Sequence, residues 1–131
     1  MLSNFDVHDE GMRYIRKLLE EENWIVEEIK NGKDDYLQIN KSESYKTYKI
    51  KVKALSKKDP VPFHTRSPES INADFFVICR NMETGNPEIF TATMTEVIKA
   101  IHKHNNDYWL EIPDYERFER GIAKLKSLKT F

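Results

Sequence analysis

Charged side chains of both signs follow one another between Gly32 and Ser56, at spacings that suit the chemistry of phosphate groups. Asp34 and Asp35 come before a short apolar-rich segment, and a run in which every second residue is lysine follows a turn. A row of ammonium groups can bind several phosphates. The stretch therefore indicates a class of ligand, although it does not identify a substrate. The alternating lysines are Lys49, Lys51 and Lys53.

The segment at residues 48–54 places these lysines on one face of a strand. Strict alternation of apolar and polar residues is the period of a half-buried strand, so the lysines would project away from the core at intervals of ~7 Å. Such rows bind backbone phosphates without reading the base sequence. We therefore expect a nucleic-acid surface on the basic segment 41–66, which holds eight basic and two acidic residues. Its candidate contacts are Lys49, Lys51, Lys57, Lys58 and Arg66, and His64 lies in the same loop.

Two simpler interpretations of the lysines stay open. The lysines can form the solvated face of an ordinary strand, or they can protect an exposed sheet edge from pairing with another chain. No aromatic residue alternates with the basic ones as a platform for stacking. Phe63 is the one candidate in the following loop, and Phe131 ends the sequence.

The length of 131 residues fits one folded domain over the whole chain. A net charge of −1 provides no overall attraction to nucleic acid or membrane, so any such binding must be local. No apolar run approaches the ~20 residues that span a bilayer, and the N-terminal residues do not resemble a signal peptide, so we expect a cytoplasmic protein. The single cysteine, Cys79, lies in an apolar run and is expected to be a buried hydrophobic residue.

The hydrophobic pattern predicts an α/β (α+β) fold in which helices flank a mixed, largely antiparallel central sheet. Three strands joined by short links would form a meander after the first helix. The proline-containing residues 56–72 would form an irregular loop, and the nearly continuous apolar run 73–80 would form a central strand. The expected helices are 9–23, 96–104 and 114–128, and the expected strands are 24–29, 36–40, 45–55, 73–80, 88–93 and 108–112.

A helix, then a meander with aspartate at the start of its second strand and lysine late in its third, resembles the PD-(D/E)xK nuclease superfamily. This is the restriction-endonuclease-like fold, which is also found in Holliday-junction resolvases. The residues that carry the resemblance are Asp35, before the segment 36–39, and the run Lys51-Val52-Lys53. The likeness covers most of the chain as architecture and three or four positions as chemistry.

The resemblance implies Mg²⁺-dependent hydrolysis of phosphodiester bonds. Asp35, or Asp34, would be the first metal ligand, and Lys53 would be the motif lysine that positions water or stabilises negative charge. Glu10 resembles the acid that some members contribute from the first helix. The position two before Lys53 is usually acidic in the family, whereas here it is Lys51, whose protonated ammonium group cannot bind Mg²⁺.

Three hypotheses about function stay open. In the first, the protein acts on or binds nucleic acid, and an acid such as Glu43 or Asp59 completes the site. In the second, it is a catalytically inactive member of the fold that serves as a protein-interaction or accessory module. In the third, it is an unrelated α/β domain. The strand order separates the third hypothesis from the other two, because the resemblance requires Asp35 and Lys53 to meet at one edge of the sheet.

Overall fold

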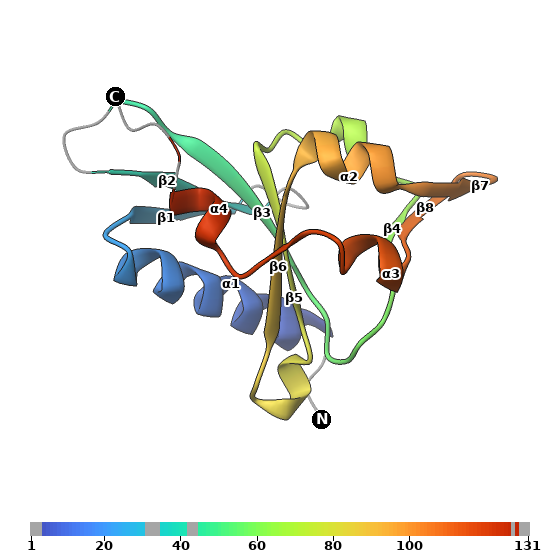
Figure 1. Cartoon of the computed structure of the whole chain (residues 1–131), viewed down its shortest axis with the longest axis horizontal. Coiled ribbons are helices and arrows are strands. Elements are labelled where there is room, and N and C mark those ends of the chain that lie inside the picture. Colours follow the sequence, from blue (N-terminus) through green and yellow to red (C-terminus); the bar gives the residue numbers. More distant parts are fainter. Residues whose placement is uncertain (1–3, 31–34, 42–44, 127, 129–131) are drawn as a thin grey trace.

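Two β-sheets and a few helices make up the computed structural model, which describes residues 4–30, 35–41, 45–126 and 128 (Figure 1). The α-helices are α1 (Asn4–Glu21), α2 (Met94–Ala100), α3 (Ile112–Tyr115) and α4 (Ala123–Lys126), and the 3₁₀ helices are η1 (Pro68–Ser70) and η2 (Met82–Thr84). The strands are β1 (Ile25–Ile29), β2 (Tyr36–Asn40), β3 (Tyr48–Ala54), β4 (Val61–His64), β5 (Phe75–Arg80), β6 (Glu88–Thr93), β7 (His102–His104), β8 (Asp107–Leu110) and β9 (Glu119–Arg120).

The larger sheet has six strands in the order β1-β2-β3-β5-β6-β9. Strands β1, β2 and β3 form the expected antiparallel meander, β3 pairs with β5 in parallel, and the remaining pairs are antiparallel. A parallel pair needs a crossover connection, and the chain between β3 and β5 supplies it with β4 and η1. The chain is therefore one α+β domain with a mixed, mostly antiparallel sheet.

Strand β5 lies at the centre of the hydrophobic interior. All of its residues are buried, as a continuous apolar run predicts for a strand that is covered on both faces. One core fills the space between the sheet and α1, and the other lies beneath the small sheet β4-β8-β7 with α2 and α3. Cys79 is buried in the first core, as expected, and this burial raises the pKa of its thiol to about 12.

Helix α1 lies along the meander and presents an apolar stripe to it (Figure 1). Met12, Ile15 and Leu19 form the buried part of this stripe. Gly11 sits where the helix crosses the end of β3, and a Cβ atom at this position would lie 2.5 Å from the Cβ of Ala54. The glycine therefore lets the helix and the strand approach closely. None of the described helices is both long enough and apolar enough to cross a membrane.

Arg80, the last residue of β5, joins the sheet to the segment around α3. Its side chain is 2% exposed, yet Nε lies 3.1 Å from Oε1 of Glu88 and Nη2 lies 2.8 Å from Oε2 of Glu116. Burial lowers the pKa of the guanidinium group, and hydrogen bonds from the group to Glu88, Tyr115 and Glu116 outweigh that effect and raise the pKa overall. The hydroxyl of Tyr115 then donates to the carbonyl oxygen of Asp59 at 2.9 Å. This network compensates a buried charge within the fold.

The predicted irregular loop at 56–72 is partly wrong, because it contains β4 and η1. Val61 and Phe63 alternate with exposed or half-buried residues and are buried in the second core. Pro62 lies between them, and it is tolerated because β4 is an edge strand of the small sheet. Because β4 is only four residues long and contains a proline, its sequence is typical of a loop.

The predicted helix 114–128 is also wrong, because the chain breaks into α3, β9 and α4. Gly121 adopts a left-handed backbone with φ 73°, and its N–H donates to the carbonyl of Ile89 at 2.8 Å. Residues just before it pair with β6 instead of continuing a helix. Similarly, the expected helix 96–104 ends at Ala100, and His102–His104 form β7. Thr93 caps α2 through a capping box with Glu96.

The first helix is longer than expected at its start, since α1 begins at Asn4 rather than near Asp9, and it ends at Glu21. The predicted third strand is shorter, at Tyr48–Ala54. Most residues of the turns expected at 30–33 and 41–44, which link the strands of the meander, fall outside the described residues. Asp34, Glu43 and Phe131 lie outside them as well.

Candidate nucleic-acid interface

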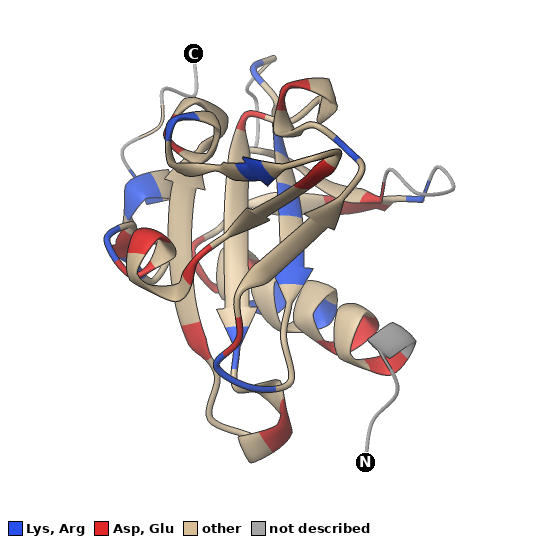
Figure 2. Ribbon diagram, turned by 90° about the vertical axis from the view of Figure 1, so that its right-hand side faces the viewer, with Lys and Arg blue, Asp and Glu red and all other residues tan. Residues whose placement is uncertain are grey.

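Strand β3 carries its lysines in the interior of the sheet. It is third in the strand order, paired with β2 on one side and with β5 on the other. Ile50 and Val52 are buried against the α1 core, so the alternating lysines project from the opposite face. Figure 2 shows these basic residues at intervals along the strand. The interpretation of the lysines as protection for a sheet edge is therefore wrong.

Lys49, Lys51 and Arg66 line a single pocket with a volume of about 250 Å³. The two lysines come from β3, whereas Arg66 follows β4 in the crossover that returns to the sheet. Tyr36 of β2 lines the pocket too, and the segment 70–73 completes it. Three of the five residues predicted to contact nucleic acid are thus brought together by the crossover, although they are separated in the sequence.

The rim of this pocket is held by local hydrogen bonds. The carboxylate of Asp74 accepts from the main-chain N–H of Lys49 at 2.8 Å, and the N–H of Asp74 donates to the carbonyl of Lys49 at 2.9 Å. Ser67 caps η1, since its Oγ accepts from the N–H of Glu69 at 3.3 Å. Ser70 Oγ donates to the carbonyl of Ser67 at 2.6 Å. These contacts fix the segment that faces the lysines across the pocket.

Tyr36 is an aromatic residue of the pocket that sequence analysis missed. The register Leu37↔Ile50 places Tyr36 across from Lys51 on the lysine face, and the ammonium of Lys49 lies 5.3 Å from the centre of the Tyr36 ring. The alternation of side chains along β2 places Tyr36 on one face of the sheet. This alternation identifies Tyr36 as a neighbour of the lysines only once the register of β2 with β3 is known. The aromatic candidate from the loop, Phe63, is instead buried against the ring of Phe76.

Lys53 lines a second pocket of about 230 Å³, beyond the end of β2. His8, Asp59 and His64 line it as well. Burial lowers the pKa of Lys53, and within the described residues its ammonium group makes neither a hydrogen bond nor an ion pair. His8 Nε2 also lies 3.5 Å from Oδ2 of Asp35. Asp35 and Lys53 therefore lie at the same end of the β2–β3 pair, with His8 beside both.

Lys51 and Glu10 bear on the Mg²⁺ site that the resemblance implies. The ammonium of Lys51 donates to the carbonyl oxygen of Asp35 at 2.9 Å, so a cation already lies beside the expected first ligand. Glu10 lines a separate hollow with Arg13 and Met82. Among the described residues, no three His, Cys, Asp or Glu side chains gather as a metal site.

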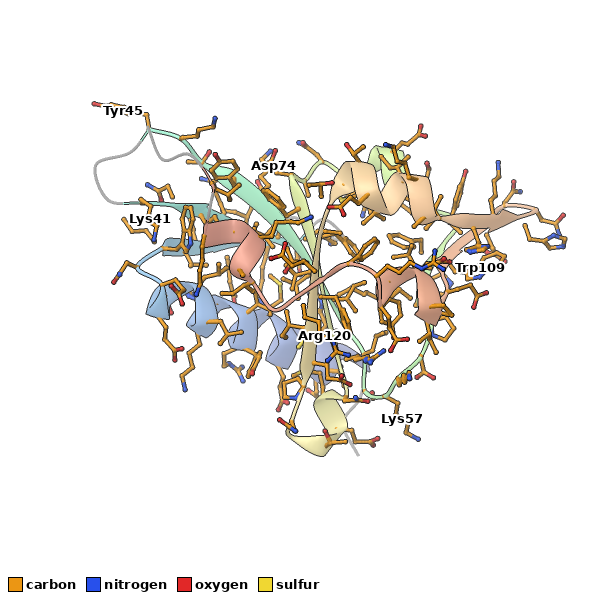
Figure 3. All side chains as sticks on the ribbon, in the orientation of Figure 1. Lys41, Tyr45, Lys57, Asp74, Trp109 and Arg120 are labelled. Carbon is orange, nitrogen blue, oxygen red and sulfur yellow. The ribbon has the colours of Figure 1, made fainter. Side chains whose placement is uncertain are left out.

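Lys57 and Lys58 do not line either pocket. Lys58 Nζ lies 3.5 Å from Oε2 of Glu116, close to the Arg80 network. Lys57 is exposed, and in Figure 3 it lies far from Asp74, which marks the first pocket. The two lysines extend the basic character of the segment without adding to the pocket.

Comparisons with protein-family models, with curated proteins and with solved structures find no match to this chain. The first pocket brings three cations together beside the ring of Tyr36.

Proposed function

We propose that this chain binds nucleic acid through the pocket of Tyr36, Lys49, Lys51 and Arg66, and that binding rather than hydrolysis is its activity. The observation that carries the proposal is the meeting of cations from β3 and from the crossover around one concave site. Ammonium and guanidinium groups form charge-assisted hydrogen bonds with phosphate oxygens. Because the net charge is −1, such attraction has to be local, as it is at this pocket.

We take a divergent restriction-endonuclease-like domain as the proposed origin of this site, on the order of its elements. Helix α1 precedes the meander, Asp35 comes directly before β2, and Lys53 lies next to the end of β3. The position of Lys51, beside the carbonyl of Asp35, favours a domain that binds phosphate over one that cleaves with a metal ion. The alternative of an inactive accessory module that binds a protein is tested by the same experiment.

Binding should weaken as the salt concentration rises, and the slope of log K against log salt should be proportional to the number of cations that contact phosphates. For three contacts, log K should fall with log salt with a slope of about −2 on single strands. Arg66→Ala and Lys49→Met should each weaken binding and reduce the magnitude of this slope by about 0.7, because each removes one phosphate contact. Fluorescence anisotropy of labelled oligonucleotides over a salt series measures both quantities.

Lys57→Met is the matched control, since it removes the same charge from an exposed position outside both pockets. It should leave the affinity and the salt slope nearly unchanged. Equal effects of Lys57→Met and Lys49→Met would show that binding follows net charge and does not involve the pocket. Nicking of a plasmid with Mg²⁺ or Mn²⁺, abolished by Asp35→Ala, would overturn the preference for binding over hydrolysis. The absence of any salt-sensitive binding would favour the protein-binding module.

A further inference from the structure

We infer that the ligand of the first pocket is single-stranded nucleic acid, with one base against Tyr36 and its phosphate among Lys49, Lys51 and Arg66. This inference rests on the proposed function and names the form of nucleic acid that the pocket takes. It depends on three features of the pocket: its size, its division into aromatic and cationic parts, and its position on the lysine row.

The size of the pocket suits a single nucleotide unit. Its volume of about 250 Å³ lies just below the range of ~300–1,000 Å³ that small-molecule clefts occupy, so it can take one nucleotide unit. A duplex keeps its bases stacked inside and presents only its outer surface to a protein. A base can enter the pocket only from an unpaired strand.

The lining of the pocket separates into two kinds of surface. Tyr36 offers a π-face, and Ile71 and Ala73 are apolar, whereas Lys49 and Arg66 are cationic. A base requires a flat apolar surface and a phosphate requires cations, so one nucleotide satisfies both at once. Inorganic phosphate or an acidic peptide would use the cations alone and would leave the aromatic ring without a partner.

The contact between Lys49 and Tyr36 suits an exchange of partners. The ammonium lies 5.3 Å from the centre of the ring and holds the ring and the cation together before a ligand arrives. When a base stacks on the ring, the ammonium can move to the phosphate that is linked to that base. Stacking does not distinguish one base from another, so we expect little preference for sequence.

The row of lysines on β3 provides a path along which a bound nucleic-acid strand can continue beyond the pocket. Lys53 follows Lys51 on the same face of β3, ~7 Å further along, and it lines the second pocket. A second phosphate of the strand can therefore meet Lys53 after the first has met Lys51. Short oligonucleotides should accordingly bind more tightly than a mononucleotide, and Lys53→Met should reduce that advantage.

The test compares Tyr36→Ala and Tyr36→Phe with the wild-type protein on labelled oligo-dT, oligo-U, a duplex of equal length and a competing mononucleotide. Tyr36→Ala should weaken binding of the single strand by roughly tenfold or more, while Tyr36→Phe, which keeps the ring, should bind nearly as the wild type does. The oligo-dT and oligo-U arms show whether DNA or RNA is preferred. Circular dichroism of both variants shows that they are folded.

Other outcomes separate this inference from the proposed function. Equal binding of duplex and single strand, with no effect of Tyr36→Ala but a loss with Arg66→Ala, would overturn the single-strand inference and leave nucleic-acid binding intact. A mononucleotide that competes as well as the oligonucleotides would overturn the extended path along β3. No binding to any of the four ligands would overturn both proposals.

Discussion

At the scale of the residue, Gly11 determines how closely α1 lies on the sheet. A Cβ atom there would lie 2.5 Å from Ala54 Cβ, closer than packed carbon atoms can approach. In an open helix, Gly→Ala gains about 1 kcal/mol from helix propensity. Here we expect overpacking of roughly 1–3 kcal/mol to outweigh that gain, so Gly11→Ala should lower the thermal midpoint by several degrees. Differential scanning calorimetry measures the change.

The partner variant Ala54→Gly provides the control for this prediction. With Gly at 54, the nearest atom to a new Cβ at position 11 would be the Cα of residue 54, at an ordinary 3.6 Å. The double variant should therefore recover stability relative to Gly11→Ala. Lys17→Ala, on the exposed side of the same helix, should change stability by less than about 0.5 kcal/mol. A stabilised Gly11→Ala protein would contradict the close packing.

The residue scale also shows what the sequence could reveal about the candidate site. Lys49, Lys51 and Arg66 could be selected as a basic group from composition and alternation alone. Tyr36 could not be added to them, because its place beside the lysines depends on the register of β2 against β3. Glu10 could be chosen only by analogy, and the structure places it in a different hollow.

At the scale of the element, the Arg80 network should make stability depend on pH. Hydrogen bonds from Arg80 lower the pKa of Glu88 and Glu116 below the ordinary value of 4.5. A carboxyl group with a lowered pKa in the folded state stabilises the fold above its ordinary pKa, and that stability is lost as pH falls through the folded value. The thermal midpoint should thus decrease as the pH is lowered below about 4.5. In Arg80→Met the midpoint should decrease less over the same pH range.

Arg80→Met should itself cost about 3 kcal/mol, because it leaves two carboxylates and Tyr115 without their shared partner. Arg120→Ala is the matched control, since Arg120 contacts the same Glu88 at 3.5 Å but is 69% exposed. It should cost less than ~1 kcal/mol. Glu88→Gln provides a milder variant if Arg80→Met does not fold. Similar losses for Arg80→Met and Arg120→Ala would refute the buried network.

Alternating and continuously apolar segments were predicted correctly as strands, and elements that depend on distant contacts were not. The meander and β5 follow from alternation and from a continuous apolar run. Strand β9 pairs with β6, a distant strand, and Gly121 after it bonds to Ile89, contacts that no local pattern reveals. Strand β4 is four residues long and contains Pro62, so its own sequence favours a loop.

At the scale of the whole molecule, β5 contributes side chains to both cores. Phe75, Val77 and Cys79 belong to the α1 core, whereas Phe76 and Ile78 belong to the core under the small sheet. A change on either face of this strand must therefore destabilise both cores. The single domain should lose its structure in one cooperative transition.

Two tryptophans report on the two halves. Trp24 is buried in the α1 core, and Trp109 lies on β8 of the small sheet. Trp24→Phe leaves Trp109 as the fluorescent reporter, and Trp109→Phe leaves Trp24. Urea unfolding of the two proteins, followed by fluorescence, should give the same midpoint. Adding Ile78→Ala should lower the urea midpoint of both proteins equally. The corresponding loss of unfolding free energy should be about 2–5 kcal/mol. Tyr45→Ala, at a fully exposed position, should change neither. Separate midpoints would show that the cores unfold independently.

The parallel pairing of β3 with β5 has a consequence for the order in which the chain can be completed during synthesis. Helix α1 and strands β1–β3 are synthesised before Phe75–Arg80, so the inner side of β3 has no hydrogen-bond partner while the crossover is still being translated. Until then the nascent chain presents an open ladder and a half-covered apolar face, the features that promote association between incomplete chains. The lysines of β3 lie beside that temporary edge and can keep neighbouring nascent chains apart by charge repulsion. We therefore expect the row to limit association of incomplete chains during synthesis, although β3 is no edge strand in the finished fold.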